Sequence, residues 1–308
     1  MSNIIMKQYL LPTARGRINV LEGAEIAFPR SVVVVLHGFR SHHQFVVHSA
    51  SDLRSMSARW SAINMKTYGL EFRGHGRSEG PRGTFDSIED LVDDLAVLLR
   101  FVQNNHPDTP TFIVAESLGA AVAVHLAHTK AFKIAGLALI SPLCELHASQ
   151  RPTSRWAEAA LLFLSRYPPF AYIRLPWSVD IVDPNLMDGR YIARSRAHPC
   201  AIERQPNMRT AGEMFLAGQR MSSLARDVNI PVLIFSGGLD TVVDADSIAR
   251  FFEAFPSNSK KHIVLRDRTH CVISPHSGLD KTANLVLDCI DDWLDEHTKV
   301  QRKSSHGG

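Results

Sequence analysis

Short apolar runs recur along this chain and alternate with segments of helical periodicity, and this alternation limits the possible folds more than any other feature. The runs occupy residues 31–38, 66–71, 111–115, 136–140, 231–238 and 261–265. Continuous apolar runs of this length are typical of strands buried on both faces of a parallel sheet. We therefore predict an α/β fold, with a mostly parallel central sheet flanked by helices.

Apolar side chains at helical spacing separate several of these runs. The stripes lie within residues 91–102, 248–255 and 285–294. Ser87 and Asp90 resemble a capping box at the start of the first of these helices.

The alternation stops between Pro142 and about Met221, where prolines and large apolar residues crowd together. We predict a helical cap, or lid, inserted between two strands of the sheet. The predicted domains are a core formed by residues 1–142 and 222–299, a cap at 143–221, and a flexible polar tail at 300–308.

Charge and cysteine content exclude several classes of protein. The formal net charge of +3 comes from 34 basic and 31 acidic residues that are interspersed, so no nucleic-acid partner is expected. The four cysteines lack metal-ligand spacing and are interpreted as reduced thiols. No leader-like apolar segment and no membrane span is visible, so we expect a cytoplasmic protein that can associate peripherally with membranes.

The stretch FIVAESLGAAVAV places Ser117 between an apolar strand pattern and a helix rich in small residues. This is the context of the nucleophile elbow G-x-S-x-G, in which a sharp turn lifts the serine hydroxyl above the sheet. Ala115 stands in place of the first glycine and adds a single methyl group to a crowded turn.

Two further residues follow Ser117 in the chain order of an α/β-hydrolase triad. Asp240 comes just after the strand at 231–238, and His270 follows the next strand. A serine hydroxyl needs an imidazole base at neutral pH, and the imidazole needs a carboxylate to fix its tautomer. We predict Ser117, Asp240 and His270 as the catalytic residues.

Other candidates exist for two of these roles. Asp244 and Asp246 are alternatives for the acid, although Asp244 is better placed to cap the following helix. His262 and His276 are alternatives for the base, but His262 is expected inside a strand. No metal or cofactor is expected, because proton transfer through His270 is sufficient.

Acyl transfer also needs hydrogen-bond donors for the oxyanion of the tetrahedral intermediate. The elbow provides the backbone N–H of Leu118, and the segment LHGFRS provides that of Phe39. We predict these two groups as the oxyanion hole.

The segment RGHGRSEGPRGTF, residues 73–85, resembles a loop of the monoacylglycerol lipase and lysophospholipase branch of the serine α/β hydrolases, also called the serine aminopeptidase-like group. Similar matches carry the resemblance through both halves of the core: VVVVLHGF, VAESLGAA, FSGGLDTVVDADSIARFF and DRTHCVI. The chain departs from the family pattern at Glu71, where the family usually has Asp, and at Ala115, where it usually has Gly.

The resemblance implies an α/β-hydrolase fold and hydrolysis of a carboxylic ester through an acyl-enzyme. Its implied substrate is a small acyl ester or lipid of the monoacylglycerol or lysophospholipid type. The large apolar cap residues could line an acyl tunnel, face a membrane, or form a cap core packed on the sheet. They are Trp156, Leu161, Leu162, Phe163, Tyr167, Phe170 and Tyr172.

Two alternative functions remain compatible with the sequence. An aminopeptidase or amidase could use the same triad, with a cap carboxylate to hold the substrate amine. The candidate carboxylates are Glu158, Asp180, Asp183, Asp188, Glu203 and Glu213. A ligand-binding protein on a hydrolase scaffold could also retain the triad.

Overall fold

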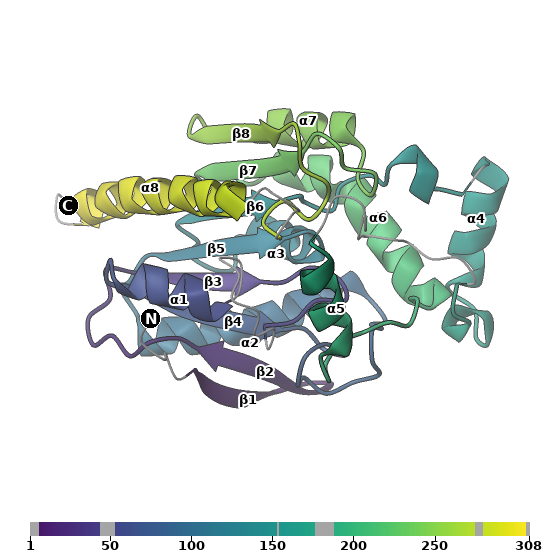
Figure 1. The fold of residues 1–308 in the computed structure, drawn as a ribbon, viewed down its shortest axis with the longest axis horizontal. Coiled ribbons are helices and arrows are strands. Elements are labelled where there is room, and N and C mark those ends of the chain that lie inside the picture. The colour runs from purple at the N-terminus through teal and green to yellow at the C-terminus, as the bar shows by residue number, and fades with distance from the viewer. Residues whose placement is uncertain (1–5, 44–52, 153, 176–187, 275–279, 306–308) are drawn as a thin grey trace.

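The computed structural model describes residues 6–43, 53–152, 154–175, 188–274 and 280–305. Its centre is an eight-stranded sheet with the order β1-β2-β4-β3-β5-β6-β7-β8 (Figure 1). The strands are β1 (Lys7–Thr13), β2 (Gly16–Glu22), β3 (Ser31–Leu36), β4 (Met65–Glu71), β5 (Thr111–Glu116), β6 (Gly136–Ile140), β7 (Val232–Gly237) and β8 (Lys260–Leu265). The six strands from β3 to β8 pair in parallel, which confirms the predicted mostly parallel sheet.

The first two strands were not expected from the sequence. β1 and β2 pair antiparallel with each other, and β2 pairs antiparallel with β4. β1 lies at the edge of the sheet and is half exposed, so it lacks the continuous apolar run by which the inner strands are recognised.

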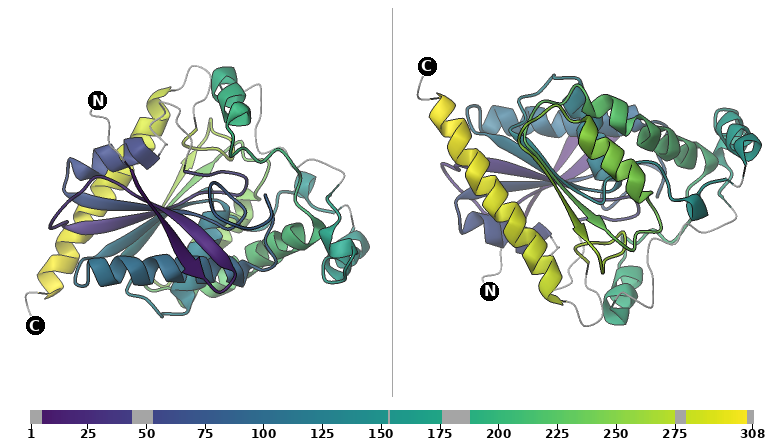
Figure 2. Two further views of the ribbon diagram at one scale, coloured as in Figure 1. Left: turned by 90° about the horizontal axis from the view of Figure 1, so that it is seen from below. Right: turned by 90° about the horizontal axis from the view of Figure 1, so that it is seen from above.

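Helices cover both faces of the sheet (Figure 2). The buried side chains of one face pack with α2, α3 and α7 and with the C-terminal part of α6, and those of the other face pack with α1 and α8. The bounds are α1 (Leu53–Ser61), α2 (Ile88–Asn105), α3 (Leu118–His128), α6 (Met208–Ala225), α7 (Ala245–Ala254) and α8 (Asp280–Ser305). Three of these helices, α2, α7 and α8, correspond to the apolar stripes predicted at 91–102, 248–255 and 285–294.

The segment between β6 and β7 is helical, as predicted. It contains η1 (Ala148–Gln150), α4 (Arg155–Leu164), η2 (Phe170–Tyr172), α5 (Gly189–Ala197) and α6. In Figure 1, α6 reaches from the core toward α4, which lies away from the sheet. Residues 143–221 remain our proposed cap, and the last turns of α6 are shared with the core.

Helix α8 differs from the predicted tail. It continues to Ser305, past residue 300, where the sequence predicts a flexible segment to begin. The residues at 299–303, KVQRK, include several good helix formers, so their polarity does not stop the helix.

The cap aromatic residues are exposed, so their interpretation as a cap core packed on the sheet is wrong. Trp156 is 87% exposed, and Phe163, Tyr167, Phe170 and Tyr172 are between 45% and 60% exposed. Within the described ranges, no helix combines the length and the apolar character needed to cross a membrane.

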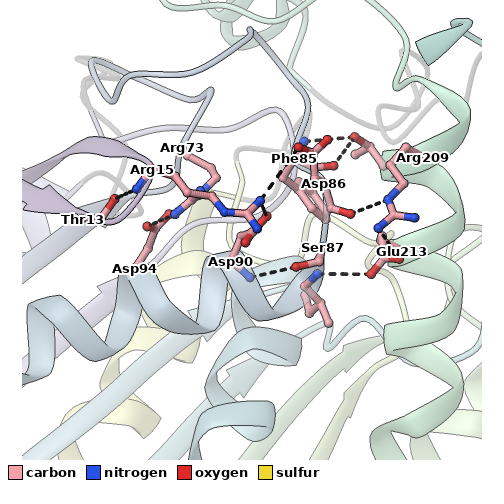
Figure 3. A network of polar contacts seen from close by, with 12 residues as sticks. Thr13, Arg15, Arg73, Phe85, Asp86, Ser87, Asp90, Asp94, Arg209 and Glu213 are labelled. Atoms are coloured by element: carbon pink, nitrogen blue, oxygen red, sulfur yellow. Dashed lines mark hydrogen bonds and ion pairs between the residues drawn. The ribbon is translucent and has the colours of Figure 1, made fainter. Parts of the chain in front are cut away.

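A polar network joins the start of α6 to the start of α2 (Figure 3). Thr210 Oγ1 donates to the Phe85 carbonyl and accepts from the Phe85 N–H, both at 3.0 Å. Glu213 accepts from the Ile88 N–H at 3.3 Å, and Arg209 Nε donates to the Asp86 carbonyl at 2.6 Å. These contacts fix the cap-side helix against the loop that follows the 73–85 motif.

Candidate active site

Ser117 occupies a sharp turn between β5 and α3. Its backbone has φ +50° and ψ −112°, and its N–H donates to the Ile140 carbonyl at 2.9 Å. A Cβ at Gly119 would lie 2.8 Å from Leu36 Cβ and from the His37 carbonyl oxygen, so this position has no room for a side chain. Ala115 is buried, which shows that the turn accepts its methyl group.

The structure brings Ser117, His270 and Asp240 into one chain of hydrogen bonds. His270 Nε2 lies 2.9 Å from Ser117 Oγ, and His270 Nδ1 lies 2.8 Å from Asp240 Oδ2. The other carboxylate oxygen of Asp240 accepts from the N–H groups of Val242 and Val243, at 2.8 and 3.0 Å. With Nδ1–H donating to Asp240, Nε2 is the acceptor that faces the serine hydroxyl.

The loops after β7 and β8 carry Asp240 and His270, and they approach each other closely. A Cβ at Gly237 would lie 2.2 Å from the Thr269 carbonyl oxygen. Next to it, the Leu239 N–H donates to the Arg268 carbonyl at 2.8 Å. The side chains of Asp240 and His270 are almost fully buried, at 1% and 4% exposure, so their hydrogen bond is shielded from water.

The alternative candidates lie elsewhere. Asp244 caps α7 by accepting from the Ser247 N–H at 2.7 Å, and Asp246 is exposed in the first turn of that helix. His262 lies in β8, where its Nε2 is 2.8 Å from Ser236 Oγ. His276 lies outside the described residues.

The predicted oxyanion donors flank Ser117. Leu118 begins α3, and Phe39 lies in a turn closed by a hydrogen bond from the Ser41 N–H to the Gly38 carbonyl at 3.2 Å. A Cβ at Gly38 would lie 3.2 Å from Ser117 Cβ, so this turn runs directly beside the serine. The role of both N–H groups stays a prediction.

Two buried histidines, His37 and His75, support this turn. His37 Nδ1 lies 2.8 Å from the Gly38 carbonyl, and its Nε2 accepts from the Phe72 N–H at 3.2 Å. His75 Nε2 accepts from the Arg40 N–H at 3.2 Å. Burial lowers the pKa of His37 well below its ordinary value and that of His75 to about 4. Both rings are therefore neutral supports at pH 7.

Glu71, one of the two departures from the family pattern, is also a buried support. Its carboxylate accepts from the His43 N–H at 3.0 Å, the Arg77 N–H at 2.7 Å and Asn19 Nδ2 at 2.8 Å. The longer Glu side chain thus binds the loop after β3 and the loop after β4 together.

Burial also shifts the pKa of two groups next to the triad. It raises the pKa of the Glu116 carboxyl, an effect that the nearby His270 opposes. It raises the pKa of the Cys271 thiol, to which Glu116 and Asp240 contribute. Within the described ranges, no three His, Cys, Asp or Glu side chains are grouped so that they could hold a metal ion.

Known proteins share this architecture over most of the chain. The family described as "Serine aminopeptidase, S33" matches residues 27–274. Among curated relatives, the monoglyceride lipase of Rattus norvegicus is 24% identical over 283 residues, which cover 88% of this chain and 84% of that protein. The monoacylglycerol lipase of Mycolicibacterium smegmatis is 23% identical over 269 residues, which cover 87% and 89% of the two chains.

Solved structures agree with the fold. The crystal structure of Paleococcus ferrophilus monoacylglycerol lipase superposes with a TM-score of 0.70 at 22% identity, covering 91% of this chain and 99% of that one. A soluble variant of the Saccharomyces cerevisiae monoglyceride lipase, in complex with a substrate analogue, gives 0.75 at 19% identity and covers 96% of both chains. Because the family match spans most of the sequence, this chain belongs to the serine aminopeptidase S33 family and is a serine hydrolase with the α/β-hydrolase fold.

Proposed function

We propose that the chain hydrolyses carboxylic esters of the monoacylglycerol or lysophospholipid type through an acyl-enzyme on Ser117. The observation that carries the proposal is the continuous hydrogen-bond chain from Ser117 Oγ through His270 to Asp240, with links of 2.9 and 2.8 Å. Such a chain supplies an activated nucleophile at neutral pH.

In the first half of the reaction, Ser117 Oγ attacks the ester carbonyl carbon while its proton moves to His270 Nε2. The carbonyl π bond opens, and the N–H groups of Phe39 and Leu118 bind the resulting oxyanion. As the tetrahedral intermediate collapses, the bond to the leaving oxygen breaks and His270 gives that oxygen its proton. Asp240 keeps the tautomer fixed and stabilises the imidazolium throughout.

The second half repeats these steps with water. His270 Nε2 takes a proton from water, whose oxygen attacks the acyl carbon. As the second tetrahedral intermediate collapses, its bond to Ser117 Oγ breaks, His270 gives that oxygen its proton, and the carboxylic acid is released. Every proton moves between the triad, the ester and the attacking water, so the triad returns to its starting state.

The proposed substrate class is supported by the relatives, which are monoglyceride and monoacylglycerol lipases, and by the exposed cap. Trp156, Phe163, Tyr167, Phe170 and Tyr172 give the cap a large aromatic surface. Aromatic residues of this kind are suited to a lipid interface, since their apolar bodies enter the headgroup region. We therefore include peripheral contact of the cap with a lipid surface in the proposal.

An aminopeptidase needs a cap carboxylate that can hold the substrate amine, and two of the four described candidates already bind other groups of this chain. Asp188 accepts from the Arg190 N–H at 2.8 Å, and Glu213 accepts from the Ile88 N–H. Asp188 thus binds the first turn of α5, the helix that follows it, and Glu213 binds the first residue of α2. Glu158 and Glu203 remain candidates for holding a substrate amine. Asp180 and Asp183 lie outside the described residues.

The test compares turnover of a long-chain 1-monoacylglycerol, a lysophosphatidylcholine and an aminoacyl p-nitroanilide by the wild type and by Ser117→Ala. We expect kcat/KM to be highest for one of the lipids and Ser117→Ala to be inactive on all three. Preference for the anilide would instead support the aminopeptidase. Equal turnover by folded Ser117→Ala would exclude this serine as the nucleophile.

A further inference from the structure

Arg40 has an unusual backbone conformation for a residue with a side chain. It is the third residue of the Gly38–Ser41 turn, and its φ is +64°. A positive φ at this position is typical of a type II turn, where glycine is the usual residue. A non-glycine residue costs about 1 kcal/mol or more there, so other contacts must hold it in place.

Contacts from two directions hold Arg40. Its backbone N–H donates to His75 Nε2 at 3.2 Å. Its side chain crosses to the cap, where Nε donates to the Ile202 carbonyl at 2.8 Å and Nη2 lies 3.4 Å from the Glu203 carbonyl. Charge-assisted bonds of this kind are stronger than neutral ones. The guanidinium therefore links the cap segment 202–203 to the turn beside Ser117.

The link matters because the Phe39 N–H belongs to the same turn and immediately precedes Arg40. An oxyanion donor must lie within hydrogen-bond distance of the position that the oxyanion will occupy. If the turn relaxed from its strained φ, the Phe39–Arg40 peptide would rotate. The preceding Gly38–Phe39 peptide, which carries the Phe39 N–H, would then move with it.

We propose that Arg40 is a positioning residue that uses the cap carbonyls of Ile202 and Glu203 to hold the Phe39 N–H in its oxyanion-binding orientation. This inference rests on the proposed function. Catalysis then depends on the position of cap segment 202–203, although that segment supplies no catalytic group.

Arg82 provides a matched control. It also donates to the cap, at the Cys200 carbonyl, with a distance of 2.7 Å. Its second bond, also 2.7 Å, goes to the Gly76 carbonyl in the loop after β4 rather than to the turn that carries Phe39. Removing Arg82 therefore loosens the same region of the cap without removing the direct link to the turn.

The experiment uses two inhibitors, an alkyl trifluoromethyl ketone and the corresponding alkyl methyl ketone. In the first, Ser117 Oγ bonds to the carbonyl carbon, the π bond opens to leave the charge on oxygen, and the hydroxyl proton moves to His270 Nε2. The adduct therefore needs the oxyanion donors, whereas the methyl ketone binds as a ground-state analogue. The ratio of the two Ki values is measured within each variant, so it is insensitive to partial unfolding.

We expect Arg40→Ala to weaken the trifluoromethyl ketone by about tenfold and to lower kcat by the same factor, with KM and the methyl ketone Ki nearly unchanged. Arg40→Gly also lacks the guanidinium but accepts the positive φ without strain, so it should lose less than Arg40→Ala. Complete loss of one donor costs about 10²–10³ in kcat, so a displaced donor should cost less. Arg40→Lys should recover part of the loss, since the ammonium can donate to one carbonyl. Arg82→Ala should leave the ratio of Ki values within about twofold of the wild type.

An unchanged ratio in Arg40→Ala would overturn the inference, as would an equal loss in Arg82→Ala, which would assign the effect to the cap in general. Failure of the wild type to form the trifluoromethyl ketone adduct would instead contradict the proposed function. Failure of the inference is therefore seen in the variants, whereas failure of the proposed function is seen in the wild type.

Discussion

His270 Nε2 lies 2.9 Å from Ser117 Oγ, although the two residues are separated by 153 positions in the sequence. The contact joins the loop after β8 to the turn after β5. Because both lie at the carboxyl ends of parallel strands, the sheet fixes their separation before any substrate arrives.

The tautomer of His270 depends on Asp240, which gives the first prediction. In Asp240→Asn, the amide oxygen can still accept from the Val242 and Val243 N–H groups, which turns the amide NH₂ toward His270 Nδ1. The imidazole must then carry its proton on Nε2 and cannot act as a base. We expect kcat for a p-nitrophenyl ester to fall by about 10⁴-fold while circular dichroism shows an unchanged fold.

Asp244→Asn is the matched control for Asp240→Asn. Asp244 caps α7, and asparagine is an equally good cap, so kcat and stability should both remain close to the wild type. A large loss of kcat in Asp244→Asn together with an active Asp240→Asn would show that the acid has been assigned to the wrong residue.

The buried histidines predict an acid-sensitive fold. Burial lowers the pKa of His42 to about 3 and those of His43 and His75 to about 4, whereas an unfolded histidine titrates near about 6.5. Between these values the unfolded chain binds more protons than the folded one, so stability is lost as the pH falls below about 6.5. Each histidine contributes about 1.4 kcal/mol per pH unit, and the three together about 4 kcal/mol at pH 5.5.

Urea unfolding at pH 7.5, 6.5 and 5.5 measures this dependence. Net proton uptake on unfolding at pH 5.5 provides an independent check on the same groups. A free energy of unfolding that is flat or rises over this range would contradict the neutral buried state of the three rings.

The ion pair between Arg73 and Asp94 predicts a strong effect on stability (Figure 3). Arg73 Nε lies 2.9 Å from one oxygen of Asp94, whose side chain is fully buried. Asp94→Ala should cost about 3–5 kcal/mol, because the guanidinium would remain buried without its counter-charge. The double variant Arg73→Met/Asp94→Leu should be more stable than Asp94→Ala alone, as measured by denaturant unfolding.

The exposed cap aromatics predict binding to lipid. Trp156→Ser/Phe163→Ser should bind phosphatidylcholine vesicles at least about tenfold more weakly than the wild type in a sedimentation assay, since each side chain buries substantial apolar area at an interface. Leu285→Ser/Val300→Ser removes two exposed apolar residues of α8 and should leave binding unchanged. Equal binding by both double variants would exclude the cap as the contact surface.

The sequence predicted the inner strands and the main helices because their signals are local. The runs at 31–36 and 232–237 are mostly apolar, and every residue in both is buried. β1 was missed because an exposed edge strand carries no such signal. The cap was recognised as helical, but the exposure of Trp156 could not be predicted, since an exposed aromatic and a core aromatic look alike in sequence.

The candidate triad was predictable because strand ends and chain order restrict where its members can lie. The role proposed for Arg40 was not, for two physical reasons. Its positive φ occurs at a position where glycine would have been the signal. Its partners at 202 and 203 are backbone carbonyls, which every residue type provides and which leave no trace in the sequence.

The most direct test of the central claim is intact-mass spectrometry after treatment with a fluorophosphonate, which reacts with activated serines. The wild type, Ser117→Ala and His270→Ala are compared, with folding of each verified by circular dichroism. We predict a single adduct on the wild type and none on either variant. A folded wild type without an adduct, or an adduct that persists in Ser117→Ala, would contradict the assignment of Ser117 as the activated nucleophile.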